Sequence, residues 1–155
     1  MNQHEAVPTV IALHIAKATR LDMVEVNCVE IPTGHGITGD RYENARHRQV
    51  TVQSLEQLDE AAAELGAPIT PGSTRRNITI DRGAVPRRPG DRITIGDLEL
   101  EVVRIAAPCT LLDDVIGRGA KRALHRRAGS VCRVLSGSTV ELGATVVLSP
   151  QSPDD

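Results

Sequence analysis

Cys109 is the residue of this sequence with the clearest potential for covalent chemistry. It follows Pro108 at the end of a predicted strand and precedes a predicted helix. A thiol at a helix N-terminus lies at the positive end of the helix dipole, which lowers its pKa and favours the nucleophilic thiolate. From the residue alone, the alternative is a small apolar side chain in the core. With Cys28 and Cys132 the cysteine count is odd and no Cys-x-x-Cys pair occurs, so we expect a lone thiolate rather than a disulfide framework or a zinc site.

A second candidate site lies in a turn that precedes a predicted strand. It contains Arg75, Arg76 and Asn77. Two guanidinium groups can bind a phosphate or carboxylate through paired hydrogen bonds, and the amide can donate to a carbonyl or ring nitrogen. The alternatives are a solvated turn, or burial of one arginine in an ion pair with an acid such as Asp81 or Glu56.

A third candidate is the glycine-rich segment 34–41, which ends in Asp40 and Arg41. Glycines allow a backbone to turn sharply or to approach a ligand closely. The segment has neither the Gly-x-x-x-x-Gly-Lys-Ser/Thr nor the Gly-x-Gly-x-x-Gly spacing of phosphate-binding loops. The alternative is that Asp40 and Arg41 only form a local cap and ion pair.

Basic residues also gather in the predicted helical region after residue 117. They are Arg118, Lys121, Arg122, His125, Arg126 and Arg127. At helical spacing several of them share one face, which predicts either a solvated basic surface or a binding site for an acidic partner.

Composition limits the classes of function. Tyr42 is the sole aromatic residue, and the net charge is −2, so the sequence argues against a nucleic-acid-binding protein with a basic surface and stacked rings. No apolar stretch has the roughly 20 residues of a membrane span, and the N-terminus lacks a signal-peptide pattern, so we expect a cytoplasmic protein. The length fits one domain over residues 1–150, followed by a polar tail, 151–155, that we expect to be disordered.

Short apolar–polar alternation dominates the rest of the chain and predicts a mostly β protein, either a barrel or a sandwich. Cys28 falls on the polar phase of its predicted strand. With no Phe or Trp, the core must consist of Val, Ile, Leu and Ala. The expected strands cover residues 10–15, 24–31, 49–52, 77–80, 92–95, 98–103, 131–135, 139–142 and 145–148.

Two or three helices interrupt the strands. Ser54 and Gln57 have the spacing of a capping box at the start of the clearest helix, which Gly66 ends. Residues 111–116 and 120–124 are also predicted to be helical, with glycines between them.

Taken in order, these motifs resemble the MOSC family, the domain found at the C-terminus of molybdenum cofactor sulfurases. The resemblance extends over most of the chain, and Pro108-Cys109 matches the Pro-Cys of the family. Tyr42 stands in place of the usual His, Ser138 in place of a Gly, and Ala144 in place of an Asp. The matching segments are residues 36–42, 48–50, 71–77, 90–96, 108–109 and 134–143.

The resemblance implies a β-barrel similar to the pyruvate kinase β-barrel domain, with Cys109 as the functional thiol. In this family the cysteine carries sulfur as a persulfide or ligates the molybdenum of a molybdopterin cofactor. Arg75 and Asn77 match the Arg-x-Asn of the amidoxime-reducing relatives. On this basis we expect Arg75, Arg76 and Asn77 to bind the cofactor, with Asp40 and Arg41 in the pocket wall. The pyridoxal-phosphate domain of full-length sulfurases has no counterpart in this sequence, so pyridoxal phosphate is not expected.

Three hypotheses follow. The first is a molybdenum cofactor-binding domain that reduces N-hydroxylated substrates with an electron-donor protein, or transfers sulfur to the metal. The second is a metal-free sulfur carrier that Cys109 loads from a cysteine desulfurase. The third is a non-catalytic module whose basic helix around Arg122 binds an acidic protein. None of the three involves nucleic acid or a membrane.

Overall fold

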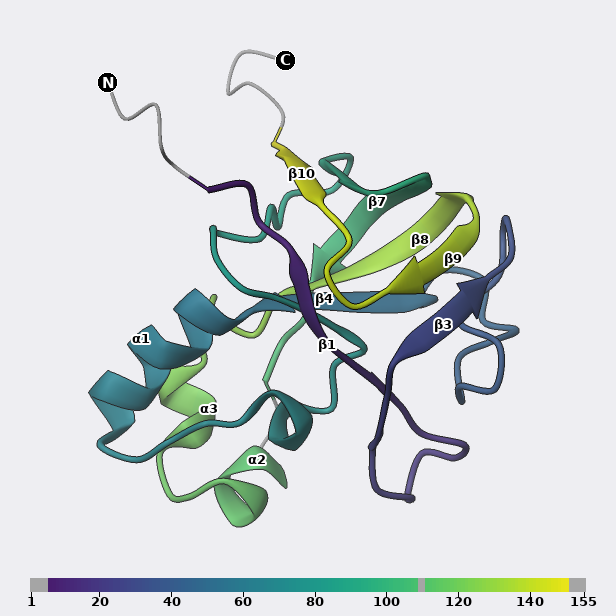
Figure 1. The fold of residues 1–155 in the computed structure, drawn as a ribbon. Helices are drawn as coiled ribbons and strands as arrows, with labels where there is room; N and C mark the ends of the chain where they lie inside the picture. Colours follow the sequence, from purple (N-terminus) through teal and green to yellow (C-terminus); the bar gives the residue numbers. More distant parts are fainter. Residues whose placement is uncertain (1–5, 109–110, 151–155) are drawn as a thin grey trace.

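The fold is mostly β, as the sequence predicts, with three short α-helices and one 3₁₀ turn among the described residues (Figure 1). The computed structural model describes residues 6–108 and 111–150. The strands are β1 (Val10–Ile15), β2 (Val24–Val26), β3 (Cys28–Ile31), β4 (Val50–Ser54), β5 (Ile78–Ile80), β6 (Arg92–Ile95), β7 (Leu98–Ile105), β8 (Ser130–Ser136), β9 (Ser138–Glu141) and β10 (Val146–Ser149). The helices are α1 (Leu55–Leu65), α2 (Leu111–Val115) and α3 (Ala120–Ala123), and the 3₁₀ turn is η1 (Pro71–Thr74).

Eight of the strands form one mixed sheet in the order β10-β6-β7-β8-β4-β5-β1-β2, and β3 pairs with β9 in a second sheet. Among the paired strands that the structure describes, β4 and β5 alone run parallel, because α1 and η1 carry the chain back across the sheet between them. The strand pairing gives an open order with β10 and β2 at its ends, not the closed barrel that we predicted. An isolated bridge between Thr9 and Thr145 joins the start of β1 to the segment before β10, together with backbone hydrogen bonds such as that from Val10 to the carbonyl of Ala144. The likeness to the pyruvate kinase barrel stays a prediction.

The sheet core consists of branched aliphatic side chains, as the composition predicts. Val50, Val52, Ile78 and Leu100 are fully buried within it. The central strands β4 and β5 are buried at every position, whereas buried and exposed positions alternate along β3, where Cys28 is exposed as its phase predicts. A chain without Phe or Trp fills this space with many small contacts between β-branched residues, which pack well on a pleated surface.

The helices gather at one end of the sheet around a separate small core (Figure 1). Leu58 of α1, Leu112 of α2 and Leu124 after α3 are buried there, with alanines that let the helices approach closely. Within residues 6–108 and 111–150, no helix is long and apolar enough to cross a membrane.

The predicted capping box at the start of α1 does not form. Ser54 is the last residue of β4 and is fully buried, and its Oγ makes no hydrogen bond within the described part of the chain. Gln57 instead accepts a hydrogen bond from the backbone N–H of Val85, 3.2 Å away. The helix thus continues directly from a buried strand, and the strand fixes the direction of Ser54. The C-terminal end agrees with the prediction, since Gly66 adopts a left-handed conformation and donates to the carbonyl of Ala62.

Candidate functional site: an arginine-lined pocket

A pocket of about 220 Å³ brings together four arginines from distant parts of the chain. Its walls come from the β1–β2 connection, the β3–β4 connection, η1 with the residues after it, the end of β7 and α2. We call it the arginine pocket. Its described lining residues are Thr19, Arg41, Tyr42, Arg48, Thr74, Arg75, Arg76, Ala107 and Leu112.

A buried polar network holds η1 against the sheet and so positions the arginines that follow it. Gln53 of β4 donates to the carbonyl of Pro71 at 3.0 Å and to the hydroxyl of Thr79 at 2.9 Å. The hydroxyl of Thr74 donates to the amide oxygen, Oε1, of Gln53. Gln53 has no exposed surface, so its amide must be satisfied inside the protein, and η1 supplies two of the partners.

Asp40 anchors the opposite wall of the pocket. Its carboxylate is fully buried and accepts the backbone N–H of Ala16 at 3.0 Å and that of Tyr42 at 3.2 Å. Nη1 of Arg41 lies 3.4 Å from the same carboxylate. Asp40 therefore fixes the turn that carries Arg41 and Tyr42 and supplies a counter-charge for the arginine.

Arg41 is buried with more donors than acceptors. Its side chain is 6% exposed. Nη1 also contacts the sulfur of Met23 at 3.3 Å, and Nη2 contacts the carbonyl of Arg75 at 3.4 Å. Its Nε is buried and has no hydrogen-bond partner within residues 6–108 and 111–150. Because an unsatisfied buried donor costs free energy, this guanidinium is suited to an additional anionic acceptor.

Arg48 is a pocket residue that we did not single out from the sequence. The guanidinium groups of Arg48 and Arg41 each lie 4.7 Å from the ring centroid of Tyr42, so the sole aromatic ring of the chain contacts two cations. Cation–π contact of this kind holds the arginines in place without neutralising them. The Nε of Arg48 is also buried without a partner in the described structure. The sequence signal for it was the segment 48–50, one of the segments that carry the family resemblance, in which we assigned no role to the arginine.

Arg75 adds a third cation in an unusual backbone conformation. Its φ is 63°, a left-handed value that costs a non-glycine residue roughly 1–2 kcal/mol. Nη2 donates to the carbonyls of Thr19 and Leu21, both at 2.9 Å. Partial burial and the positive charge of Arg41 lower the pKa of Arg75, and the carboxylates of Asp22 and Asp40 oppose this shift. The pocket is therefore crowded with positive charge.

Arg76 is turned inward and binds main-chain carbonyls. It is 5% exposed, its Nε donates to Ala128 at 2.9 Å, and its Nη2 lies 3.4 Å from the carbonyl of Ala106 and 3.3 Å from that of Ala107. These three partners are carbonyls rather than the acids Asp81 or Glu56. Arg76 thus fixes the end of β7 where the chain leaves for Pro108, at the border of the pocket.

Comparison with known proteins agrees with this arrangement. The family model of the MOSC domain matches residues 37–147, which include Asp40 and all four pocket arginines. The chain belongs to the MOSC domain family. No curated protein matches it.

Solved structures show the same fold. YuaD of Bacillus subtilis has a TM-score of 0.83 and 21% identity, and the match covers 94% of this chain and 98% of that one. YiiM of Geobacillus stearothermophilus has a TM-score of 0.68 and 17% identity, with 94% and 77% covered. YiiM of Escherichia coli has a TM-score of 0.64 and 16% identity, with 93% and 71% covered.

Asn77 is not among the described lining residues, although the Arg-x-Asn motif of the MOSC relatives led us to expect cofactor contact. It is 2% exposed. Its Oδ1 accepts from the backbone N–H and the hydroxyl of Thr51, both at 3.1 Å, and its Nδ2 donates to the carbonyl of His14 at 3.1 Å. Nδ2 also lies 3.5 Å from Asp40. Asn77 therefore joins β4, β1 and the Asp40 turn, and these contacts help to fix the turn that forms one wall of the pocket.

The thiols of this MOSC domain differ in their surroundings. Cys132 is fully buried in the sheet core, and burial raises the pKa of its thiol, so we expect it to be unreactive. Cys28 is exposed on β3. Cys109, the predicted functional thiol, lies outside the described residues, but Ala107 of the pocket wall precedes it by two positions. Within the described ranges no group of three or more His, Cys, Asp or Glu is placed to hold a metal.

His14 packs against η1 in an environment that disfavours its protonated form. Its imidazole is buried, and its Nδ1 has no hydrogen-bond partner in the part of the chain described. Burial lowers its pKa below the usual 6.5, and the carboxylate of Glu25, 3.9 Å from Nε2, only partly opposes this. A Cβ on Gly72 of η1 would lie 3.1 Å from the same Nε2, so a larger residue at this position would crowd the ring.

We expect the free energy of unfolding to fall as the pH drops below 6.5 toward the lower pKa of folded His14. In that range the unfolded chain takes up a proton that the folded imidazole resists, so acid favours unfolding. Urea unfolding at several pH values between about 5 and 8 measures this slope, and His14→Gln should reduce it. An unchanged slope in the variant would show that other groups cause the pH dependence.

Proposed function

We propose that this MOSC domain binds a molybdopterin-type cofactor, with the cofactor phosphate in the arginine pocket and Cys109 as the sulfur ligand. The observation that carries the proposal is the convergence of four arginines on a pocket that is bordered by Ala107 and has no carboxylate among its described lining residues. Positive charge of this density in a partly buried pocket favours an anionic ligand.

The pocket residues fit a phosphate. The buried Nε–H groups of Arg41 and Arg48 are donors without an acceptor among the described residues. Phosphate oxygens are strong acceptors of charge-assisted hydrogen bonds. Burial, and after it repulsion from Arg41, lower the pKa of Arg75, and a bound dianion would offset this repulsion. The volume, about 220 Å³, is below the roughly 300–1,000 Å³ of pockets that enclose a whole organic ligand, so it suits the charged end of a larger molecule.

Cys109 would supply the remaining contact. A thiolate is a soft ligand suited to molybdenum, and nearby guanidinium groups favour the thiolate over the thiol. Arg76 holds the two carbonyls just before Pro108 and so acts as a positioning residue for this segment.

The bound cofactor supplies a metal that exchanges electrons. In the proposed reaction the N–O bond of an N-hydroxylated compound breaks and two electrons come from an electron-donor protein. One proton converts the leaving hydroxyl to water, and a second proton is taken up by the nitrogen.

The second candidate function is a metal-free sulfur carrier. The thiolate of Cys109 would attack the outer sulfur of a desulfurase persulfide, the S–S bond of the donor would break, and the donor thiolate would leave. The same positive pocket favours this candidate, because it stabilises both a thiolate and the persulfide anion.

Arg48→Met tests the proposal with little disturbance of the fold. Methionine keeps an apolar stem against Tyr42 but removes the charge and a buried unsatisfied donor, so the free energy of unfolding should not fall. Loss of one charge-assisted contact of about 1.5–3 kcal/mol should weaken cofactor retention about tenfold or more. The measurement is molybdenum and pterin per chain in protein from a host that makes the cofactor, with exposed Arg46→Met as the control.

Equal molybdenum and pterin in wild type and both variants would contradict the arginine pocket as the binding site. Cyanide-releasable sulfur on Cys109 without any pterin would favour the metal-free sulfur carrier instead.

A further inference from the structure

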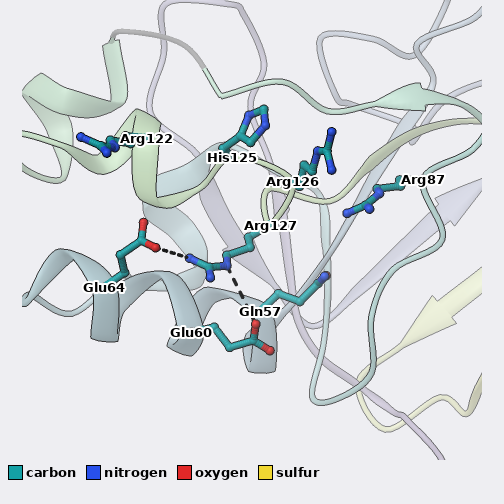
Figure 2. Close-up of a pocket in the computed structure, with 8 residues that line it drawn as sticks. All are labelled: Gln57, Glu60, Glu64, Arg87, Arg122, His125, Arg126 and Arg127. Atoms are coloured by element: carbon teal, nitrogen blue, oxygen red, sulfur yellow. Dashed lines mark ion pairs between the residues drawn. The ribbon is translucent and has the colours of Figure 1, made fainter.

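We propose that the exposed cations around α3 form a docking surface for an acidic protein. We call this the α3 basic surface, and it comprises Arg87, Arg118, Lys121, Arg122, His125 and Arg126. All six side chains are exposed. Four of them, Arg87, Arg122, His125 and Arg126, border a cleft of about 530 Å³ beside α1 (Figure 2).

Four arginines and two glutamates line this cleft, and its ion pairs involve one of the four arginines. Figure 2 shows Arg127 directed toward α1, where it lies 3.4 Å from Glu64 and 3.9 Å from Glu60. Arg127 thus forms ion pairs with both glutamates of the cleft. Arg87, Arg122 and Arg126 form no ion pair within residues 6–108 and 111–150. Three exposed guanidinium groups remain available to carboxylates of another protein.

The backbone at Arg126 supports a functional role for this charge. Its φ is 62°, and in the described chain Arg75 is the other non-glycine residue with a positive φ. Glycine would adopt this conformation without the roughly 1–2 kcal/mol cost. One strained arginine borders the arginine pocket and the other belongs to the α3 basic surface. Strain retained at such positions is typical of residues kept for binding.

The α3 basic surface is continuous with the segment that leads to Cys109. A second cavity, of about 600 Å³, is lined by Lys121, Arg122 and His125 together with Ala107 and Pro108. Arg122 and His125 border both this cavity and the cleft beside α1. Ala107 borders both this cavity and the arginine pocket. A protein bound to the α3 basic surface would therefore lie next to the proposed cofactor site.

The chemistry of the surface favours a protein over a nucleic acid. The chain as a whole carries a net charge of −2, and its sole aromatic ring belongs to the arginine pocket, so no stacking platform accompanies the arginines. Glu60 and Glu64 border the same cleft and would repel a continuous row of phosphates. A protein face with separated carboxylates fits this mixture of charges. Resting on the proposed function, the partner is the acidic protein that delivers electrons or sulfur to the Cys109 site.

A fluorescein-labelled peptide of alternating glutamate and alanine serves as the probe, and its fluorescence anisotropy reports binding. We expect binding at low salt that weakens as salt screens the charges. Arg122→Glu/Arg126→Glu should weaken it at least tenfold. The control, Lys17→Glu/Arg46→Glu, makes the same change in net charge on two exposed residues of the β1–β2 and β3–β4 connections. Neither residue lines the cleft beside α1 or the cavity next to it, so the control should change the affinity less than twofold.

Arg126→Gly provides a second variant in case the charge reversals disturb folding. Glycine relieves the left-handed strain, so the fold should be at least as stable while peptide binding weakens. Equal peptide affinity in the α3 and control variants would overturn the proposal. Tighter binding of a DNA duplex, or of vesicles of phosphatidylserine and phosphatidylcholine, than of the peptide would overturn it as well.

The two proposals fail in different ways. The α3 variants leave the arginine pocket intact, so their molybdenum and pterin content should equal that of the wild type. Loss of peptide binding with full cofactor content supports the docking surface, whereas a chain that never retains cofactor but still binds peptide through Arg122 and Arg126 contradicts only the proposed function.

Discussion

Replacing Cys109 with alanine is expected to abolish the retention of molybdenum and of transferable sulfur, with loss of essentially all of each. The thiolate is the one metal ligand that we assign to this chain, and alanine can neither coordinate a metal nor form a persulfide. Metal analysis and cyanide release of sulfur, on protein from a host that makes the cofactor, measure the two losses.

The matched control for this variant is Cys28→Ala. Cys28 is exposed on β3, in the second sheet, so its removal tests the loss of a different accessible thiol. We expect the control to retain molybdenum and sulfur at the wild-type level. Losses of the same size in both variants would contradict a specific role for Cys109.

Replacing Asp40 with alanine is expected to lower the free energy of unfolding by about 3–5 kcal/mol. The substitution leaves the guanidinium of Arg41, which is 6% exposed, without its buried counter-charge. It also removes the acceptor for the backbone N–H groups of Ala16 and Tyr42. Urea unfolding measures the loss, and exposed Asp59→Ala on α1 serves as the control for removing a carboxylate.

Asp40→Ala also reports on the charge of the arginine pocket. With one negative charge removed, inorganic phosphate should stabilise the variant more than it stabilises the wild type, because the pocket is then more positive. A destabilisation under about 1 kcal/mol would contradict the assignment of Asp40 as the buried anchor of this wall.

Much of the site was predictable because short motifs fix local geometry. The turn that contains Asp40 and Arg41, and the turn that contains Arg75 and Arg76, were both candidates from the sequence, and the fold brings the two turns to one pocket. The alternation of β3 correctly predicted that Cys28 faces outward.

What the sequence did not predict depends on contacts between distant segments. The direction of Arg76 is set by the carbonyls of Ala106 and Ala128, far away along the chain, and the role of Arg48 depends on the position of the Tyr42 ring. The capping box failed for the same reason, since β4 places Ser54 in the interior before α1 begins. Closure of the sheet is another long-range property, and alternation alone cannot distinguish a barrel from an open curved sheet.

The pocket also shows how one residue type can have separate roles within one site. Arg76 has its guanidinium directed at carbonyls and stabilises the chain before Pro108. Asp40 holds Arg41 and the Tyr42 ring holds Arg48, but the Nε–H of each arginine has no acceptor among the described residues. The first arrangement resembles a structural contact, and the second has the features of a preorganised anion site.

The central claim is that the arginine pocket and Cys109 bind the same ligand. The most direct test is anomalous X-ray scattering at the molybdenum edge, from crystals of protein produced in a host that makes the cofactor. The account predicts one molybdenum peak bonded to the sulfur of Cys109, with phosphate density at Arg41, Arg48 and Arg75. A molybdenum peak at any other position, or phosphate density away from these arginines, would contradict it.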